Sequence, residues 1–203
     1  MSMRILRLVA LAIFTLSTGI AVAQQCGDPA DLTCNGSCAA GSACDASQTG
    51  LGCECVPGLP LGVKKLSIKL NFAEPGADSI DLQGTVPVPA GFRPDGLQVI
   101  VDVGGVVRSF TLDAKGKAVT ELDRAQLKVK FENGDIPEQD AKLTVKIKKG
   151  TFSDSFVDEN LTSRTIQDDP VQVVADVTVS GKLYTQTVAL SYTAKTGKTG
   201  KAK

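Results

Sequence analysis

Histidine and tryptophan are absent from this 203-residue chain, and only two tyrosines are present. Without histidine, neither a Ser-His-Asp nor a Cys-His catalytic arrangement can form, and the commonest general base is missing. No glycine-rich loop follows a strand and opens a helix, so the usual phosphate-binding motif is missing as well. These absences predict a protein that is not an enzyme and that needs no cofactor.

Aromatic residues are too few to suggest a sugar-binding surface. Such sites usually present aromatic faces to sugar rings, and tryptophan is lacking here. Tyr184 and Tyr192 are eight residues apart on one strand pattern, so they share a face of that strand. We therefore expect both tyrosines to pack in the core.

Long hydrophobic runs are confined to the N-terminus. Two arginines precede an apolar run over residues 8–14, and small residues at 21–23 fit a cleavage site. We expect residues 1–23 to be a secretory signal peptide, because the run is shorter than the roughly 20 residues that a membrane span needs. A lipid anchor on Cys26 is the alternative, but Gln25 stands where a lipoprotein carries a small residue.

Charge of neither sign is in excess, since 22 Lys and Arg residues balance 22 Asp and Glu residues. Loss of the two signal-peptide arginines would leave 20 basic residues against 22 acidic ones. Such a balance gives no general attraction to nucleic acid. We expect a secreted, periplasmic or extracellular protein with no nucleic-acid partner and no stable membrane insertion after signal cleavage.

Cysteine is absent from the whole chain beyond residue 55. The six cysteines are Cys26, Cys34, Cys38, Cys44, Cys53 and Cys55. Turn-forming Gly, Asn, Asp and Ser residues separate them, without the apolar periodicity of a core. Export and this dense spacing predict a disulfide-stapled module over residues 24–57. Zinc is the alternative, but histidine and paired Cys-x2-Cys knuckles are both missing.

Residues 52–58, Gly-Cys-Glu-Cys-Val-Pro-Gly, resemble the Gly-Cys-x-Cys-x-Pro-Gly stretch of EGF-like modules. The resemblance is to an incomplete module, because no sixth cysteine follows the Cys-x-Cys pair. It implies three disulfides: Cys34–Cys44, Cys38–Cys53 and Cys26–Cys55. Six cysteines allow 15 pairings, so this one is a hypothesis.

Beyond the cysteines, apolar and polar residues alternate. The clearest runs are residues 66–72, 97–103, 127–131, 143–147 and 171–179. A period of two predicts half-buried antiparallel strands, and Pro-Gly, Gly-Gly, Asn-Gly and Ser-Gly pairs between the runs predict turns. We expect a β-domain over residues 64–194, after a short linker at 58–63 and before a flexible basic tail at 195–203.

The alternating domain has an internal echo. In each half, two strands are followed by a phenylalanine, a hairpin and an Ala-Lys segment, and the two hairpins turn at Gly104-Gly105 and Ser180-Gly181. One half alone would leave its apolar face in water. The predicted fold is therefore all-β: an antiparallel β-sandwich of about eight strands built from two similar halves, preceded by the disulfide-stapled module.

Several stretches of this domain are similar to the β-rich repeats of uncharacterised secreted proteins from environmental bacteria. The similarity rests on residues 66–72, 101–105 and 110–116. These residues encode strands and turns, so the resemblance implies a fold and no activity.

One acidic segment interrupts the strand pattern. Apolar residues at near-helical spacing between 153 and 162 predict a short crossover helix. Asp154, Asp158 and Asp168 lie in or near it and are the residues that could bind Ca²⁺ or serve as a carboxylate pair for hydrolysis. Their spacing matches no EF-hand loop, and solvated surface acids are the simpler interpretation, so no metal site and no catalytic site are predicted.

These patterns favour a secreted, non-enzymatic structural or protein-binding protein. Its loops or strand edges would meet an unidentified macromolecule at the cell surface or outside the cell. A Ca²⁺- or polysaccharide-binding accessory domain is the alternative from another functional class.

Overall fold

The computed structural model describes residues 41–46 and 53–203, and within them nearly all of the regular secondary structure is antiparallel β-structure. The predicted signal peptide and the first three cysteines lie outside the described residues. Among the described residues, no helix has the length and the apolar character of a membrane-spanning segment.

The described part of the cysteine-rich module is a two-stranded ribbon. Strand β1 (Ser42–Ala46) pairs with β2 (Cys53–Pro57), and Cys44 lies opposite Cys55 in the register. The structure describes no cysteine as a free thiol. The disulfide framework and its connectivity stay predictions, because half of the cysteines lie outside the described residues.

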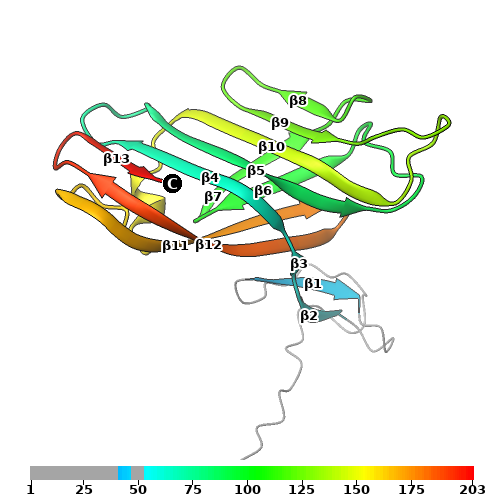
Figure 1. Ribbon diagram of the computed structural model, residues 1–203, viewed down its shortest axis with the longest axis horizontal. Coiled ribbons are helices and arrows are strands. Elements are labelled where there is room, and N and C mark those ends of the chain that lie inside the picture. The colour runs from blue at the N-terminus through cyan, green and yellow to red at the C-terminus, as the bar shows by residue number, and fades with distance from the viewer. Residues whose placement is uncertain (1–40, 47–52) are drawn as a thin grey trace, which may run out of the picture.

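All other strands belong to one sheet (Figure 1). They are β3 (Leu59–Pro60), β4 (Gly62–Asn71), β5 (Asp78–Val88), β6 (Gln98–Val103), β7 (Val106–Thr111), β8 (Lys117–Val119), β9 (Arg124–Lys128), β10 (Gln139–Gly150), β11 (Ile166–Val179), β12 (Lys182–Ala194) and β13 (Thr199–Ala202). Their order is β7-β6-β11-β12-β13-β4-β5-β10-β9-β8, and β3 is attached to β12 as the one parallel pairing described. The terminal strands β7 and β8 approach within 8 Å between Cα atoms, so the sheet is nearly closed into a barrel.

Burial alternates along the strands and explains the curvature. In β5 every second residue is buried over the whole strand, and β10 and β11 alternate in the same way. The inward set is mainly Val, Leu and Ile, with Tyr184 and Tyr192 also buried as the sequence predicts. A single sheet with one apolar face removes that face from water by curving around it.

The strand order has a two-fold pattern when it is read around the nearly closed barrel. If β4 to β8 are exchanged in turn with β9 to β13, the same order results in the reverse direction. Two of the pairings between these halves join a strand to its own counterpart: β5 pairs with β10, where Leu82 faces Val145, and β6 pairs with β11, where Val101 faces Val177. The pattern is broken at one place: β12 pairs with β13, whereas the equivalent edges of β7 and β8 stay unpaired.

Side chains hold this open seam together. Arg108 in β7 forms an ion pair with Asp123, which precedes β9, at 3.1 Å between Nε and Oδ2. The other oxygen of Asp123 accepts a hydrogen bond from the backbone N–H of Lys148 at 3.0 Å. The Arg108 guanidinium also lies 5.3 Å from the centre of the Phe152 ring, within the range of a cation–π contact.

The predicted sandwich differs from this arrangement in strand number and in connection. The expected sandwich has about eight strands in all, divided between two sheets. Instead, eleven strands are hydrogen-bonded into one continuous sheet. A period-two pattern identifies which face of a strand is buried, but it does not determine which strands pair with it. Strand β13 supplies the continuity, because it pairs with β12 on one side and with β4 on the other.

Two local predictions were wrong. The expected flexible tail contains β13, in which Gly200 and Ala202 point inward and are buried. The expected linker contains β3 and the first residues of β4. Both segments are short, and the tail is also poor in large apolar residues, so their pairing depends on edges that other strands supply.

The expected crossover helix is a single 3-10 turn, η1 (Ser153–Phe156). Phe156 and Leu161 from this crossover are fully buried. The apolar spacing therefore identified a packed connection, but the segment closes through turns rather than through helical hydrogen bonds.

A buried carboxylate fixes the crossover to the first hairpin. Asp78, at the start of β5, is 2% exposed. It accepts hydrogen bonds from the backbone N–H groups of Asn71 and Phe152, each at 2.6 Å. One side chain thus joins the end of β4 to the segment that leaves β10.

Replacing Asp78 with alanine should lower the free energy of unfolding by about 2–4 kcal/mol, because two buried N–H groups lose their acceptors. Asp78→Asn retains one acceptor oxygen and should be less damaging. Urea denaturation would measure both changes against Asp95→Ala, which removes an exposed carboxylate. Equal stability of Asp78→Ala and Asp95→Ala would contradict this role.

Candidate functional site

The charged residues on the outward face of six adjacent strands are predominantly basic. On β13, β4, β5, β10, β9 and β8, the inward set forms the core and the alternate set points to solvent. The outward cations, which together we call the lysine face, are Lys65, Lys69, Lys117, Arg124, Lys128, Lys142, Lys146, Lys148, Lys201 and the adjoining Lys203. On the outward positions of the same strands, the carboxylates are Asp81 and Asp140.

Pairs of like charge lie directly opposite each other on this face. Lys201 pairs in register with Lys69 across β13 and β4. Lys142 faces Lys128, and Lys146 faces Arg124, across β10 and β9. Like charges in directly opposed positions destabilise a sheet, so folding alone does not account for this arrangement.

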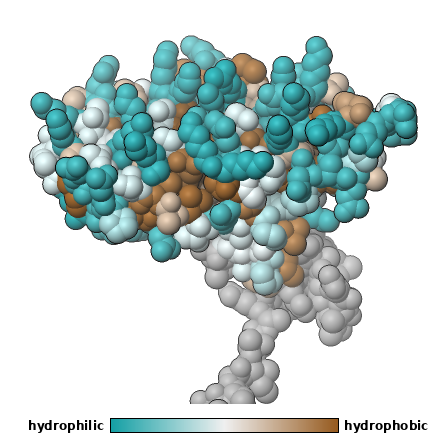
Figure 2. Space-filling view, viewed as in Figure 1, coloured by the Kyte–Doolittle hydropathy of each residue, from teal (hydrophilic) through white to brown (hydrophobic). Residues whose placement is uncertain are grey.

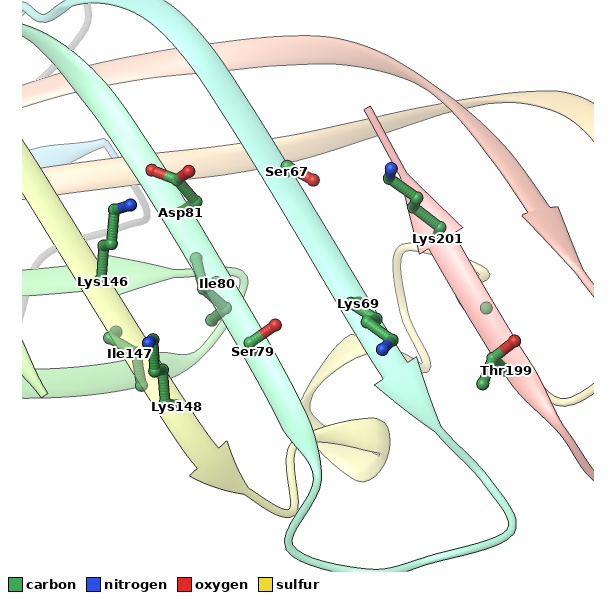
Figure 3. A pocket seen from close by; sticks show the side chains of 11 residues that line it. Ser67, Lys69, Ser79, Ile80, Asp81, Lys146, Ile147, Lys148, Thr199 and Lys201 are labelled. Atoms are coloured by element: carbon green, nitrogen blue, oxygen red, sulfur yellow. The ribbon is translucent and has the colours of Figure 1, made fainter. Parts of the chain in front are cut away.

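A shallow depression lies at the centre of the lysine face (Figure 3). Its volume is about 470 Å³. Lys69, Lys146, Lys148 and Lys201 surround it, and short hydroxyl side chains from β4, β5 and β13 lie between them. Four cations with hydroxyl donors around an open depression can bind an anion.

Asp81 is the acidic member of this depression. It forms an ion pair with Lys65 at 3.1 Å and faces Lys146 across the strands. Partial burial by itself would raise the pKa of Asp81, but hydrogen bonds from Lys65 and Gln83 and the charges of Lys65 and Lys146 lower it overall. Asp81 therefore stays ionised and offsets part of the positive charge without reversing it.

Strands on the opposite side of the barrel have negatively charged outward residues. Strands β6 and β11 contain no lysine or arginine. Asp102 and Asp176 lie directly opposite each other on these strands, and the crossover residue Glu159 lies close to Asp102. The basic and acidic residues are equal in number over the whole chain. The outward charges are nevertheless mainly basic on the lysine face and acidic on β6 and β11.

The carboxylates on the acidic side are incompletely satisfied. Asp102 accepts a hydrogen bond from the backbone of Gly105 at 2.8 Å. Within the described residues, one buried oxygen of Glu159 and one of Asp176 have no hydrogen-bond partner. Burial raises the pKa of Asp102, with a smaller contribution from the Asp176 charge, and burial followed by the charges of Asp158 and Asp102 raises the pKa of Glu159.

The sequence-derived Ca²⁺ candidates occupy separate local settings. Asp154 lies in η1 and Asp158 in the turns after it, both exposed. Asp168 lies on an irregularity of β11 and accepts hydrogen bonds from Ser191 at 3.1 Å and from Thr193 at 3.4 Å. Over the part of the chain that the structure describes, no three acidic or cysteine side chains gather in a way that could hold a metal ion.

The lysine face was not recognised from the sequence, although its signal is present there. The Lys-Leu-Thr-Val-Lys-Ile-Lys segment at 142–148 places three lysines on the face opposite the core residues. The alternation identifies the buried residues of a strand, and its polar alternate residues are typical of any solvated surface. Only the sheet order shows that basic sets from distant parts of the chain lie side by side.

The acidic side predicts a stability that falls as pH rises. Because the pKa values of Asp102 and Glu159 are raised in the folded state, that state binds protons more tightly than the unfolded chain does. Stability should therefore be lost as pH rises through these raised pKa values and regained as pH falls towards the ordinary range near 4.

Replacing Asp176 with asparagine should stabilise the protein at pH 7 by about 0.5–1 kcal/mol, because it removes the like-charge pair with Asp102. It should also weaken the pH dependence of stability, because the Asp176 charge contributes to the raised pKa of Asp102. Thermal unfolding at several pH values would measure both effects, with the exposed Asp154→Asn as control. An unchanged pH dependence in Asp176→Asn would show that the pair does not control it.

Comparison of the chain with known protein families, with curated proteins and with solved structures finds no match. The functional assignment therefore depends on the charge distribution and the geometry described above.

Proposed function

We propose that this protein is a secreted, non-enzymatic binding protein whose lysine face binds an anionic polymer outside the cell. The supporting observation is the lysine face itself, in which ten cations share one surface with two carboxylates. Its three opposed like-charge pairs are unfavourable for folding and favourable for binding a negatively charged partner.

The spacing of the lysine face suits a polymer better than a small anion. Neighbouring strands are about 4.8 Å apart, and alternate residues along a strand are about 6.6 Å apart. The cations thus lie at regular spacings on five of the six strands, β5 being the exception, and the central depression is open rather than enclosing. A polymer with regularly repeated negative groups can contact many of these positions at once, whereas a single anion contacts a few.

An acidic polysaccharide is the polymer class that we favour. The predicted signal peptide and cysteine framework favour a location outside the cytoplasm, where such polymers occur and nucleic acid is not the expected partner. The face lacks aromatic platforms for stacking on sugar rings, so recognition would depend on charge and hydroxyl contacts. Binding should therefore weaken as ionic strength increases.

The first test is binding of polygalacturonate, with neutral dextran as control. Affinity should fall at least ten-fold when Lys69, Lys146 and Lys148 are all replaced with glutamine, because their charges surround the depression. A matched variant would replace Lys115, Lys182 and Lys195, which are exposed lysines outside the lysine face, and should bind nearly as well as the wild type. Equal losses in the two variants, or no binding by the wild type at low salt, would contradict the proposal.

A single substitution should separate stability from binding. Lys142→Glu converts the opposed Lys142–Lys128 pair into an attractive one. It should raise the free energy of unfolding by about 0.5–1 kcal/mol while it weakens polygalacturonate binding. Urea denaturation and binding isotherms would measure the two effects, with Lys182→Glu as control. A variant that gains no stability would show that the like-charge pair costs nothing.

A further inference from the structure

A strand-wide gap interrupts the sheet beyond the end of β13. Up to that point β13 lies between β12 and β4, and the last ladder pair joins Lys203 and Ser191 through reciprocal backbone hydrogen bonds of 3.0 and 3.2 Å. Strands β12 and β4 both continue past this pair, β12 back to Lys182 and β4 back to Gly62. No described strand lies between them there.

The far end of the gap is closed by the chain itself. The backbone N–H of Leu61 donates to the carbonyl of Thr185 at 3.0 Å, and the backbone N–H of Val63 donates to the side chain of Gln186 at 2.8 Å. The gap therefore extends along β12 for the residues between Gln186 and Ser191. Four residues of extended chain span about 13 Å.

The gap is widest where β13 ends and narrows towards Gln186. Because β13 is hydrogen-bonded to both neighbours, β12 and β4 are two strand spacings apart beside it, or about 9.6 Å, whereas they are in direct contact at Val63 and Gln186. They are parallel to each other, since β13 is antiparallel to each of them. One short extended segment with the same direction as β13 would fit between them at the wide end.

Both edges of the gap present backbone groups. In an antiparallel ladder, residues two apart point their N–H and C=O groups to the same side. Ser191 bonds to Lys203, so Ala189 and Thr187 direct these groups into the gap. Just after β4, the backbone N–H of Phe72 donates to the carbonyl of Lys198, on the side where β13 lies. Leu66 is six residues earlier, an even number, so its backbone groups point to the same side and face the gap.

Side chains give the gap an apolar floor and a basic rim. A groove of about 380 Å³ occupies it, and Val63, Leu66, Val188 and Leu190 are its apolar lining. Figure 2 shows this apolar surface between hydrophilic regions, on the face where β4, β12 and the end of β13 lie in Figure 1. The basic members of the rim are Lys64, Lys65, Lys201 and Lys203.

We propose that this groove binds an extended acidic segment of a partner protein as an added strand between β4 and β12. Its backbone would hydrogen-bond to both edges, which is the strand-addition mode of peptide recognition. Its inward side chains would cover Val188 and Leu66, and its outward acidic side chains would lie among the four rim lysines. Because successive side chains alternate, the matching sequence alternates acidic and apolar residues.

The backbone groups at both edges of the groove and its apolar floor favour a peptide over a polysaccharide as the bound partner. A sugar polymer can match the lysines but has no row of peptide N–H groups at strand spacing for both edges. This binding is independent of the lysine-face proposal, although Lys65, Lys201 and Lys203 belong to both surfaces.

The probe is the tetrapeptide Glu-Val-Glu-Val, acetylated and amidated, with a fluorescent label for anisotropy measurements. We expect saturable binding to the folded protein. The same peptide with N-methylated valines should bind at least ten-fold more weakly, because it has fewer backbone donors. A Lys-Val-Lys-Val peptide should not bind. Equal binding of the methylated and unmodified peptides would overturn the strand-addition proposal.

Two variants test the location. Ala189→Pro removes a backbone N–H that faces the gap, and Val188→Phe fills the apolar floor while it keeps the backbone intact. Each should weaken peptide binding at least ten-fold and leave polygalacturonate binding unchanged, provided that urea denaturation shows a folded protein. Wild-type peptide affinity in both variants would overturn the assignment of the groove.

Reciprocal controls separate the two proposals. The variant with Lys69, Lys146 and Lys148 replaced by glutamine should keep peptide binding, since these residues are not part of the groove lining. Displacement of the peptide by polygalacturonate from that same variant would assign the groove to a polyanion instead. A dimer in sedimentation that Val188→Phe abolishes would assign the groove to a second copy of the chain. Either result would overturn the proposal.

Discussion

The architecture depends on β13, a strand of four residues between two much longer ones. One side of the barrel wall contains β7, β6, β11 and β12, and the other contains β4, β5, β10, β9 and β8. At this junction β13 joins them, with hydrogen bonds to β12 and to β4. Its inward residues are Gly200 and Ala202, and a side chain at Gly200 would overlap the ring of Tyr192. Small size at these positions is therefore a condition for the continuous sheet.

The chain has no net charge, but its positive and negative surface charges are strongly separated. The sheet order brings the basic outward residues of β13, β4, β10, β9 and β8 onto one side and leaves β6 and β11 with carboxylates and no cations. Each side is self-repulsive, as the Lys142–Lys128 and Asp102–Asp176 pairs show. Net charge therefore hides the property that most constrains the partner, because electrostatic attraction acts over distances shorter than the barrel at physiological salt.

Local patterns predicted the strands well and their assembly poorly. Alternation at residues 66–72 and 143–147 identified inward residues that are indeed buried, and the paired positive-φ residues at Gly104-Gly105 and Ser180-Gly181 form the two expected hairpins. The tail was misread because Thr-Gly-Lys-Ala has almost no hydrophobic signal of its own. The lysine face and the groove were beyond prediction, since both are made by strands that are distant in the sequence.

The two-fold strand order also bears on how the chain reaches its native state. The hairpins β4–β5, β6–β7, β9–β10 and β11–β12 are local, but the pairings that join the halves connect Leu82 with Val145 and Val101 with Val177. Contacts of such long sequence separation form late and slowly, because loop-closure entropy opposes them. During synthesis the first half would expose its apolar inner face until most of the second half has emerged. A barrel of interlocked halves thus has a vulnerable interval before completion, in which unpaired strands need protection from aggregation.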